Sequence, residues 1–378
     1  MRLAFNLTAA IPGSSGFVHA TELLRAMVRI AGTHQLIAVT LREQEPLRDA
    51  LPADVEQVVI DGAPRQALQR TAWLQWRLPA LVRDADADLL FNKGNFHLFR
   101  GGVRQVCMLE NANPFSRLDL PQPMGMRIRN RLLRVMSASA LRHAAGLVFP
   151  SDTARRRILA QIPTRAATTV VPYGWRPADP EPIETRPEPP YILVVTSLYP
   201  HRNLPLAVQA LAHLHARGTF RGRLVMVGGG PADYGRWLAK LVASSPVAAH
   251  VHVLPPMTTG QLATLYGSAA VALMPSLEET FGIPVLEAMG YGVPLVASRI
   301  ADADASRYFL PFEEIAGDAA EYFDPRDAAS CADAIERALR DERRRELVCA
   351  GRARAAGYGW MSVAQRTLGF LESVGPRG

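Results

Sequence analysis

The sequence predicts an α/β protein built from two tandem, doubly wound (Rossmann-like) parallel sheets, and three observations support this. Short β-branched runs alternate with longer helical patterns along both halves of the chain, which favours parallel sheets covered by helices on both faces. One proline-rich stretch, RPADPEPIETRPEPP at residues 176–190, interrupts the alternation, because its six prolines cannot continue a helix or pair within a central strand. The length of 378 residues suits two domains.

The expected elements follow in order along each half. The opening MRLAFN predicts a first strand, and helical spacing appears at 17–30 and 124–143. Further buried strands are expected at 36–40, 87–91, 104–109, 146–150 and 168–172, and then at 191–197, 223–230, 250–254, 269–275 and 293–298. Ligands of such sheets bind at the carboxyl ends of the strands. We therefore expect a cleft between the two domains to hold the site.

These patterns predict four segments. Residues 1–175 form the first domain and residues 176–190 a stiff linker. Residues 191–357 form the second domain, and residues 358–378 form a C-terminal helix that packs back on the first.

The composition is that of a soluble globular protein, with 48% apolar and 20% charged residues. Three scattered cysteines, Cys107, Cys331 and Cys349, imply neither a disulfide framework nor a zinc ribbon and fit a reducing cytoplasm. The first residues resemble a strand more than a signal peptide, and no apolar run reaches about 18 residues. The sequence therefore predicts a cytoplasmic protein, with peripheral contact at the inner face of the cell membrane left open.

The positive charge is concentrated in the first half. Residues 1–175 hold 22 Lys and Arg against 13 Asp and Glu, whereas residues 176–378 hold 20 against 22. This asymmetry indicates that the first half faces something anionic, such as a membrane surface, a phosphorylated acceptor or nucleic acid. The acidic second half argues against a nucleic-acid binder.

The most informative stretch is PSLEETFGIPVLEAMGYGVPLVAS at residues 275–298. A strand ends there, a helix starts near Pro284, Glu279 precedes the helix and Glu287 lies within it. A helix start offers free N–H groups and the positive end of the dipole to an anion. The two carboxylates can accept hydrogen bonds from sugar hydroxyls without a metal. The alternative is a pair of surface glutamates on an ordinary βα unit.

This stretch resembles the motif of the retaining glycosyltransferases of family 4, which have the GT-B fold. The family motif runs approximately P-S-x-x-E-G-F-G-x-P-x-L-E-A-M-A-x-G-x-P-V-V, and the chain departs from it at Thr280 and Gly290. The resemblance continues at 148–156, 171–175, 197–204 and 315–325 and at Trp360. The first half is similar only loosely, at Gly16 and Ser151.

The resemblance implies a set of donor-binding residues in the second domain. Arg202 would hold the donor diphosphate, with His201 as a second basic residue; Ser197 lies where many relatives have another arginine, so Arg202 and the helix start would carry more of the phosphate. The alternative for Arg202 is a solvated residue before the helix at 203–217. Glu279 would contact the donor sugar and Glu287 the ribose. The remaining donor contacts would come from Thr280, Phe281, Gly282 and Ile283 along the sugar and phosphates, and from Pro256 and Met257 near the nucleobase.

The first domain would bind the acceptor. IPGSSGF at residues 11–17 joins a strand to a helix where relatives have a glycine-rich loop, and only Gly16 matches well; a plain βα turn is the alternative. Glu110 and Asn111 end a strand where the family often has His-Asn or His-Asp. Glu110 would orient or deprotonate an acceptor hydroxyl, or it is a simple strand-end carboxylate.

Two further patterns concern the membrane and metals. MGMRIRNRLLRVM at 124–136 is basic and amphipathic, with Arg127, Arg131 and Arg134 on one face. Such a stretch suits an anionic bilayer or a solvated helix that packs on its own domain. The D-x-D patterns at 84–88 and 302–304 are interpreted as incidental, and the histidines and cysteines do not cluster. No metal or other cofactor is expected.

Together these features predict a metal-independent retaining glycosyltransferase. It would move a hexose or deoxyhexose from a GDP- or UDP-linked donor to a saccharide or polyprenyl-linked acceptor, in surface polysaccharide or lipopolysaccharide synthesis. The resemblance implies a front-face mechanism in which the leaving diphosphate helps to deprotonate the acceptor. The alternatives are an epimerase or phosphorylase of the same fold, and a non-catalytic sugar-nucleotide-binding protein. A dinucleotide oxidoreductase is disfavoured, because residues 226–234 lack the G-x-G-x-x-G pattern.

Overall fold

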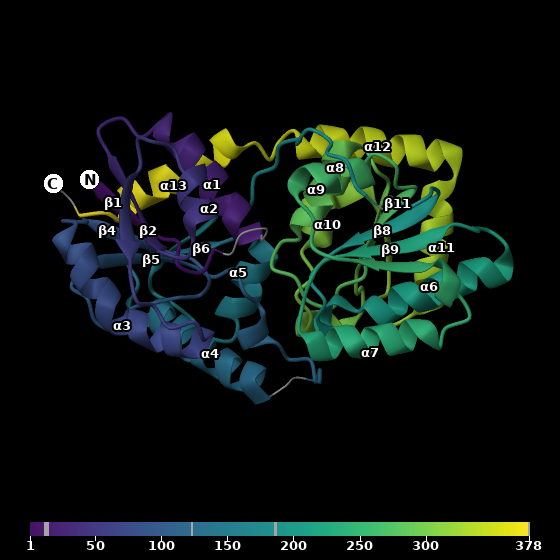
Figure 1. The fold of residues 1–378 in the computed structure, drawn as a ribbon, viewed down its shortest axis with the longest axis horizontal. Helices are drawn as coiled ribbons and strands as arrows, with labels where there is room; N and C mark the ends of the chain where they lie inside the picture. Colours follow the sequence, from purple (N-terminus) through teal and green to yellow (C-terminus); the bar gives the residue numbers. More distant parts are fainter. Residues whose placement is uncertain (11–14, 122–123, 185–186, 377–378) are drawn as a thin grey trace. The chain divides into compact units, whose positions relative to one another are not determined.

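The computed structural model describes residues 1–10, 15–121, 124–184 and 187–376 (Figure 1). The chain divides into two compact units. Unit 1 comprises Met1–Phe115, Pro123–Gly174 and Trp360–Gly378, and unit 2 comprises Ser116–Gln122 and Trp175–Gly359. Each unit is built on one parallel sheet with helices on both faces, which is the fold class that the sequence predicts.

Unit 1 contains a seven-stranded parallel sheet in the order β3-β2-β1-β4-β5-β6-β7. The strand order reverses between β1 and β4, which are hydrogen-bonded neighbours with Phe5 opposite Phe91. In doubly wound sheets such a reversal marks the place where ligands bind. The strands are β1 (Arg2–Asn6), β2 (Gln35–Leu41), β3 (Glu56–Ile60), β4 (Leu89–Asn92), β5 (Arg104–Met108), β6 (Gly146–Phe149) and β7 (Ala167–Val170).

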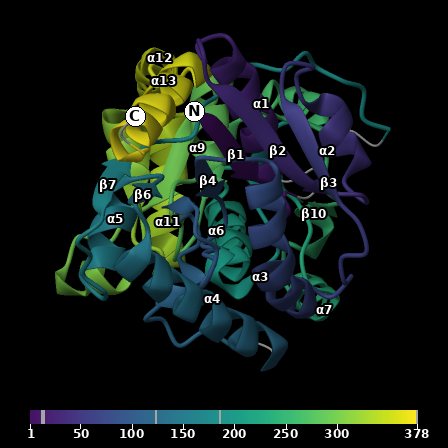
Figure 2. The same cartoon turned by 90° about the vertical axis from the view of Figure 1, so that its left-hand side faces the viewer.

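The helices of unit 1 cover both faces of this sheet. Helices α3 and α4 lie side by side on one face (Figures 1 and 2) and share a buried core that includes Leu74, Leu78 and Met136. On the other face α1 packs against α13. The helices are α1 (Ser15–Val28), α2 (Glu45–Ala50), α3 (Ala67–Asp84), the short η1 (Asn113–Phe115), α4 (Met124–His143), α5 (Asp152–Leu159) and α13 (Trp360–Val374).

Helix α13 comes from the end of the chain yet is part of unit 1. A Cβ atom at Gly146 of β6 would lie 2.8 Å from the ring of Phe370, and one at Gly174 would lie 2.4 Å from the ring of Trp360. These glycines therefore let α13 pack closely against the sheet and the segment after β7.

Unit 2 contains a six-stranded parallel sheet in the order β10-β9-β8-β11-β12-β13. Helix α11 packs against α6, and α12 packs against α9. The strands are β8 (Tyr191–Val195), β9 (Arg223–Val227), β10 (Val251–Leu254), β11 (Val271–Met274), β12 (Leu295–Ser298) and β13 (Ala320–Phe323). The helices are η2 (Pro200–Arg202), α6 (Leu204–Arg217), α7 (Ala232–Ala243), η3 (Ala248–His250), α8 (Thr259–Tyr266), α9 (Ile283–Tyr291), η4 (Ala303–Arg307), α10 (Phe312–Ala316), η5 (Gly317–Ala319), α11 (Ala328–Leu339) and α12 (Asp341–Ala355).

The proline-rich segment expected as a linker is grouped with unit 2. Its backbone bonds to α8 explain this, because Glu181 N donates to Gly260 O at 3.0 Å and Thr264 Oγ1 donates to Glu181 O at 2.6 Å. Residues 185 and 186 of the segment lie outside the described residues. In the described part of the chain, no helix combines the length and apolar character needed to cross a membrane.

Candidate functional site

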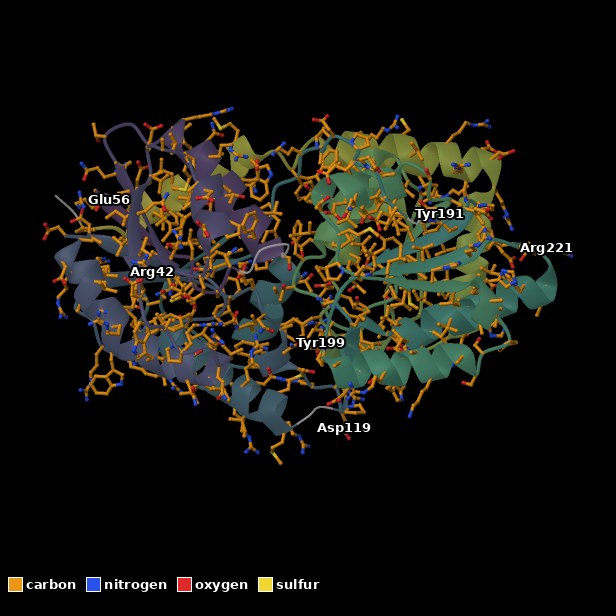
Figure 3. All side chains as sticks on the ribbon, in the orientation of Figure 1. Arg42, Glu56, Asp119, Tyr191, Tyr199 and Arg221 are labelled. Carbon is orange, nitrogen blue, oxygen red and sulfur yellow. The ribbon has the colours of Figure 1, made fainter. Side chains whose placement is uncertain are left out.

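The predicted donor residues of unit 2 gather where strands β8 and β11 end. Figure 3 shows Tyr191, at the start of β8, and Tyr199, beyond its end, on opposite sides of unit 2 along the direction of the strand. The short η2 follows β8 and carries Arg202. The loop after β11 carries Glu278 and Glu279 and leads into α9. The site thus lies at the carboxyl edge of the sheet, as the sequence predicts.

Gly282 sets the start of α9. Its φ of 95° is a left-handed conformation, and a Cβ atom there would lie 2.8 Å from the Phe312 ring. Only glycine accepts both conditions without strain. Pro284 lies in the first turn of the helix, as predicted. The loop before it is fixed by Glu279 N, which donates to Phe309 O at 2.7 Å. The first turn of α9 is therefore held in a fixed position, and a helix start of this kind can bind an anion.

Arg202 forms an ion pair with Glu279, and both side chains are 17% exposed. The alternative of a solvated Arg202 is therefore wrong. Its Nε atom is buried and has no hydrogen-bond partner among the described residues. Burial lowers the pKa of Arg202 to about 10, so the guanidinium stays charged at neutral pH. The structure thus brings the predicted phosphate-binding cation next to the predicted sugar-binding carboxylate.

Glu278 is a site residue that the sequence reasoning missed. It is 2% exposed, and its Oε1 atom has no hydrogen-bond partner among the described residues. Burial raises the pKa of Glu278 to about 7, although a hydrogen bond from Ser116 and the charge of Arg202 lower it. Nothing in the pair Glu278-Glu279 shows from sequence which of the two is buried.

His201 does not supply the second positive charge that was considered for it. Burial, and then the charge of Arg202, lower the pKa of His201 to about 3. The imidazole is therefore neutral near pH 7 and stacks on Tyr199 with ring centroids 5.7 Å apart. Its backbone oxygen accepts a hydrogen bond from Leu277 N at 2.8 Å. His201 thus helps to fix the loop that carries Glu278 and Glu279.

Glu287, on α9, is held in place by a tyrosine of α8. Tyr266 Oη donates to Glu287 Oε2 at 2.9 Å, and Tyr266 stacks on Tyr291 with centroids 5.3 Å apart. Burial raises the pKa of Glu287 to about 7, while the bond from Tyr266 lowers it. Together with the paired Glu279, this shows that neither glutamate of the motif is a freely solvated surface residue.

The other predicted donor residues lie near these contacts in different ways. Thr280 and Phe281 are buried, and Phe281 packs edge-on against Tyr358 at 6.0 Å. Ser197 is half-buried, and its carbonyl accepts from Tyr199 N at 3.0 Å. Pro256 is exposed and lies against Gly229, in the loop after β9, with the half-buried Met257 beside it.

In unit 1, Glu110 belongs to a cluster of titratable side chains. Tyr173 Oη donates to Glu110 Oε2 at 2.5 Å, and Lys93 Nζ lies 3.5 Å from the same oxygen. Lys93 Nζ is also 2.8 Å from His19 Nδ1. The sequence reasoning missed Lys93, Tyr173 and His19; only the position of Lys93 directly after a strand could have signalled one of them.

Asn95 holds the turn that carries Glu110 and Asn111. Its Oδ1 atom accepts from the backbone N atoms of both residues at 2.9 Å, and its Nδ2 atom donates to Asn111 O at 3.1 Å. The side chain of Asn111 accepts from Asn113 N at 3.0 Å and so braces the same turn. Gly16 lies in α1, whereas residues 11–14 of the predicted loop lie outside the described residues.

The predicted membrane-facing arginines of α4 differ in their contacts. Arg127, Arg131 and Arg134 are all exposed. Arg134 is tied to its own unit, because its Nη1 atom donates to Pro114 O at 2.7 Å and its guanidinium lies 5.6 Å from the Phe115 ring centroid. Arg134 is therefore exposed but also held against its own unit.

The second D-x-D pattern has a local structural use. Asp302 Oδ1 accepts from Asp304 N at 2.9 Å, which caps η4, and Asp302 pairs with Arg326 at 2.6 Å. Within the described ranges there is no group of three or more His, Cys, Asp or Glu side chains that could hold a metal ion.

The chain is similar to known proteins in both sequence and fold. Residues 176–354 match the family described as glycosyl transferases group 1. A D-inositol 3-phosphate glycosyltransferase of Frankia alni is 34% identical over 210 residues, which cover 51% of this chain and 49% of that protein. The O-antigen chain mannosyltransferase B of Escherichia coli is 30% identical over 183 residues, which cover 47% of this chain and 44% of that protein. The matches thus span about half the length of these curated relatives or less.

The similarity of fold extends over the whole chain. The crystal structure of WaaG, a glycosyltransferase involved in lipopolysaccharide biosynthesis, aligns with a TM-score of 0.74 at 16% identity, covering 97% of this chain and 98% of that one. Residues 176–354 are thus similar to the glycosyl transferases of group 1, and the two Rossmann-like parallel-sheet units have the GT-B architecture.

Proposed function

We propose that the protein is a retaining, metal-independent glycosyltransferase. It transfers a hexose or deoxyhexose from a GDP- or UDP-linked donor to a saccharide or lipid-linked saccharide. The observation that carries this proposal is the Arg202–Glu279 ion pair at the start of α9, inside the residues that match the family. The names of the relatives, a D-inositol 3-phosphate glycosyltransferase and an O-antigen mannosyltransferase, support a sugar donor and a hydroxyl acceptor.

The geometry of unit 2 suggests how a donor is held. Arg202 and the first N–H groups of α9 would bind the diphosphate and stabilise the charge that develops on it as it leaves. A phosphate that takes the guanidinium of Arg202 releases Glu279, whose carboxylate can then accept hydrogen bonds from the donor sugar. Glu287, oriented by Tyr266, would accept from the ribose hydroxyls. Donor binding would thus replace the ion pair between Arg202 and Glu279 with one between Arg202 and the diphosphate.

Transfer itself requires alignment more than a strong base. The bond between the sugar carbon and the diphosphate oxygen breaks, and the acceptor oxygen bonds to that carbon on the same face. The proton of the reacting hydroxyl passes to the departing diphosphate oxygen. Unit 1 would orient the acceptor through Glu110, which lies at the carboxyl edge of its sheet. The contribution of the protein is then positioning and charge stabilisation.

The proposal is tested with a panel of nucleotide sugars and saccharide acceptors, in the presence of EDTA. We expect one donor to yield a glycoside of retained anomeric configuration together with free nucleoside diphosphate, at a rate that EDTA leaves nearly unchanged. Loss of the rate with EDTA and its return with Mn²⁺ or Mg²⁺ would refute metal independence. Conversion of the donor alone would indicate an epimerase, and binding without turnover a sugar-nucleotide-binding protein.

Unit 1 also carries a surface suited to an anionic membrane. Exposed apolar side chains of α3, α4 and the loop between β4 and β5 include Trp76 at 78%, Phe99 at 49% and Ile128 at 49%. Phe99 N donates to Gln75 Oε1 at 3.0 Å, which joins that loop to α3. The exposed arginines Arg77, Arg100, Arg127, Arg129 and Arg131 lie on the same elements. We propose that this surface makes peripheral contact with the membrane that carries a lipid-linked acceptor.

Replacing Arg127 and Arg131 with glutamine is expected to weaken binding to anionic vesicles roughly thirtyfold, because each basic residue near such a surface contributes about 1 kcal/mol. Trp76→Ser should weaken it further. The controls are Arg344→Gln with Arg345→Gln on α12, and Trp237→Ser on α7, which are also exposed but lie in unit 2. Sedimentation with vesicles at low salt measures the effect, and equal binding by all variants would show that α4 is only a solvated helix.

A further inference from the structure

We propose that Lys93 is a positioning residue that, together with Tyr173, holds the Glu110 carboxylate ready to accept a hydrogen bond from a neutral sugar hydroxyl of the acceptor. This inference rests on the proposed glycosyl transfer and extends it, because it assigns a role to Lys93, Tyr173 and His19 and names the chemistry that the site of unit 1 recognises.

The place of this cluster in the fold points to a ligand site. Lys93 directly follows β4, and His19 lies on α1, the helix that follows β1. Because β1 and β4 are the neighbours between which the strand order reverses, these two residues lie at the switch point of the sheet. Glu110 follows β5 and Tyr173 follows β7, so all four come from the carboxyl edge. This is the edge at which doubly wound sheets bind ligands.

The contacts show how the carboxylate is fixed. Lys93 Nζ at 3.5 Å and Tyr173 Oη at 2.5 Å approach the same oxygen, Glu110 Oε2. The ammonium also donates to His19 Nδ1 at 2.8 Å, which requires a neutral imidazole with its proton on Nε2. Burial, and then the charge of Lys93, lower the pKa of His19 well below its usual value, in agreement with a neutral imidazole. One oxygen of Glu110 is therefore held from two directions.

The burial of Lys93 makes the pair mutually dependent. The Lys93 side chain is 6% exposed and that of Glu110 is 16% exposed. Burying an ammonium ion is costly unless it is paired. Burial lowers the pKa of Lys93, while Glu110 raises it. The aromatic ring of Tyr173 lies 5.9 Å from Lys93 Nζ, and the ring of Trp360 packs edge-on against His19 at 5.6 Å. These rings shield the pair from water and strengthen its attraction.

The charge of the cluster identifies the ligand class. Lys93 and Glu110 cancel, and His19 is neutral, so the cluster has no net positive charge with which to bind a phosphate. A carboxylate instead suits hydroxyl donors. Because the single proton of the reacting hydroxyl goes to the leaving diphosphate, Glu110 would accept from another hydroxyl of the acceptor. The site of unit 1 thus recognises a neutral polyol, and Lys93 acts on it through Glu110.

The experiment compares Lys93→Met and Lys93→Arg with the parent enzyme. We expect Lys93→Met to raise KM for the acceptor roughly tenfold or more and to leave KM for the donor unchanged. Because Lys93 acts through Glu110 and not on the reacting atoms, kcat should change less than KM for the acceptor. Lys93→Arg should bring KM for the acceptor back toward the parent value.

A matched set of variants keeps the test independent of folding and of turnover. Tyr173→Phe, which leaves the ion pair in place, should raise KM for the acceptor as well. This variant tests the inference even if Lys93→Met fails to fold. In urea unfolding, Lys93→Met combined with Glu110→Gln should cost less stability than the sum of the two single changes. Additive costs would overturn the pairing even if the parent transfers no sugar.

The remaining outcomes are distinct. A parent enzyme that transfers no sugar refutes the proposed function. A parent that transfers sugar, with Lys93→Met raising both KM values equally and Lys93→Arg restoring neither, shows a merely structural lysine and overturns this inference.

Discussion

Arg202→Ala is expected to weaken the binding of free nucleoside diphosphate about ten- to a hundredfold, whereas Glu279→Ala should leave that binding intact or strengthen it. Losing a charge-assisted hydrogen bond costs about 1.5–3 kcal/mol, which corresponds to this loss of affinity. In the structure Arg202 is paired with Glu279. A phosphate must therefore compete with Glu279 for the guanidinium, and removing the carboxylate removes the competitor.

Arg202→Ala, Glu279→Ala and Glu287→Ala should also differ in which kinetic or binding constant they change. Glu279→Ala should lower kcat, because the donor sugar is no longer aligned for attack. Glu287→Ala should weaken the bare nucleotide through the ribose. Calorimetric titration of the three variants with nucleoside diphosphate, beside steady-state rates, measures the split. Arg217→Ala, which removes an arginine that pairs with Asp333 on the surface, serves as the control. Equal loss of nucleotide affinity in the Glu279 and Glu287 variants would contradict the division of roles.

The fold could be predicted from sequence wherever strands are fully buried. The expected runs at 36–40, 191–197 and 293–298 became β2, β8 and β12, which lie inside their sheets. The sequence reasoning did not identify two strands, β3 and β13. Each is an outermost strand of its sheet. Both contain exposed or half-buried residues, and a glutamate interrupts their apolar run, whereas the identified outer strands β7 and β10 contain no acidic residue. The existence of β3 and β13 depends on the neighbouring strands they pair with.

The residues of the candidate site likewise divide into those that a local sequence pattern indicates and those that only the fold brings together. Glu279, Glu287 and Arg202 carry a signal in the local sequence, because a strand, a loop and a helix start occur there at recognisable spacing. Lys93, His19 and Tyr173 come from three different elements, and only the folded sheet brings them to Glu110. The charge state of His201 depends on burial, which a single sequence does not show. Residues that act through tertiary contacts were therefore the ones missed.

Glu278 belongs to this missed group, and its burial has a measurable consequence. Burial raises its pKa to about 7 from the ordinary value of 4.5. The folded protein then binds this proton more tightly than the unfolded chain does. The contribution to stability is present below the ordinary pKa and is lost as the pH rises through about 7. A protonated Glu278 near neutral pH also leaves Glu279 as the carboxylate paired with Arg202.

Glu278→Gln is accordingly expected to raise the free energy of unfolding at pH 8 by up to about 3 kcal/mol, the equivalent of the pKa difference. At pH 4 the same change should have little effect, because the parent carboxyl is then neutral in both states. Urea unfolding of parent and variant at the two pH values measures this, since all other groups titrate alike in both proteins. Glu313→Gln, with a side chain 62% exposed, is the matched control and should be neutral at both. A Glu278→Gln variant that is destabilised at pH 8 would instead show an ionised Glu278 that serves Arg202 as a second counter-charge.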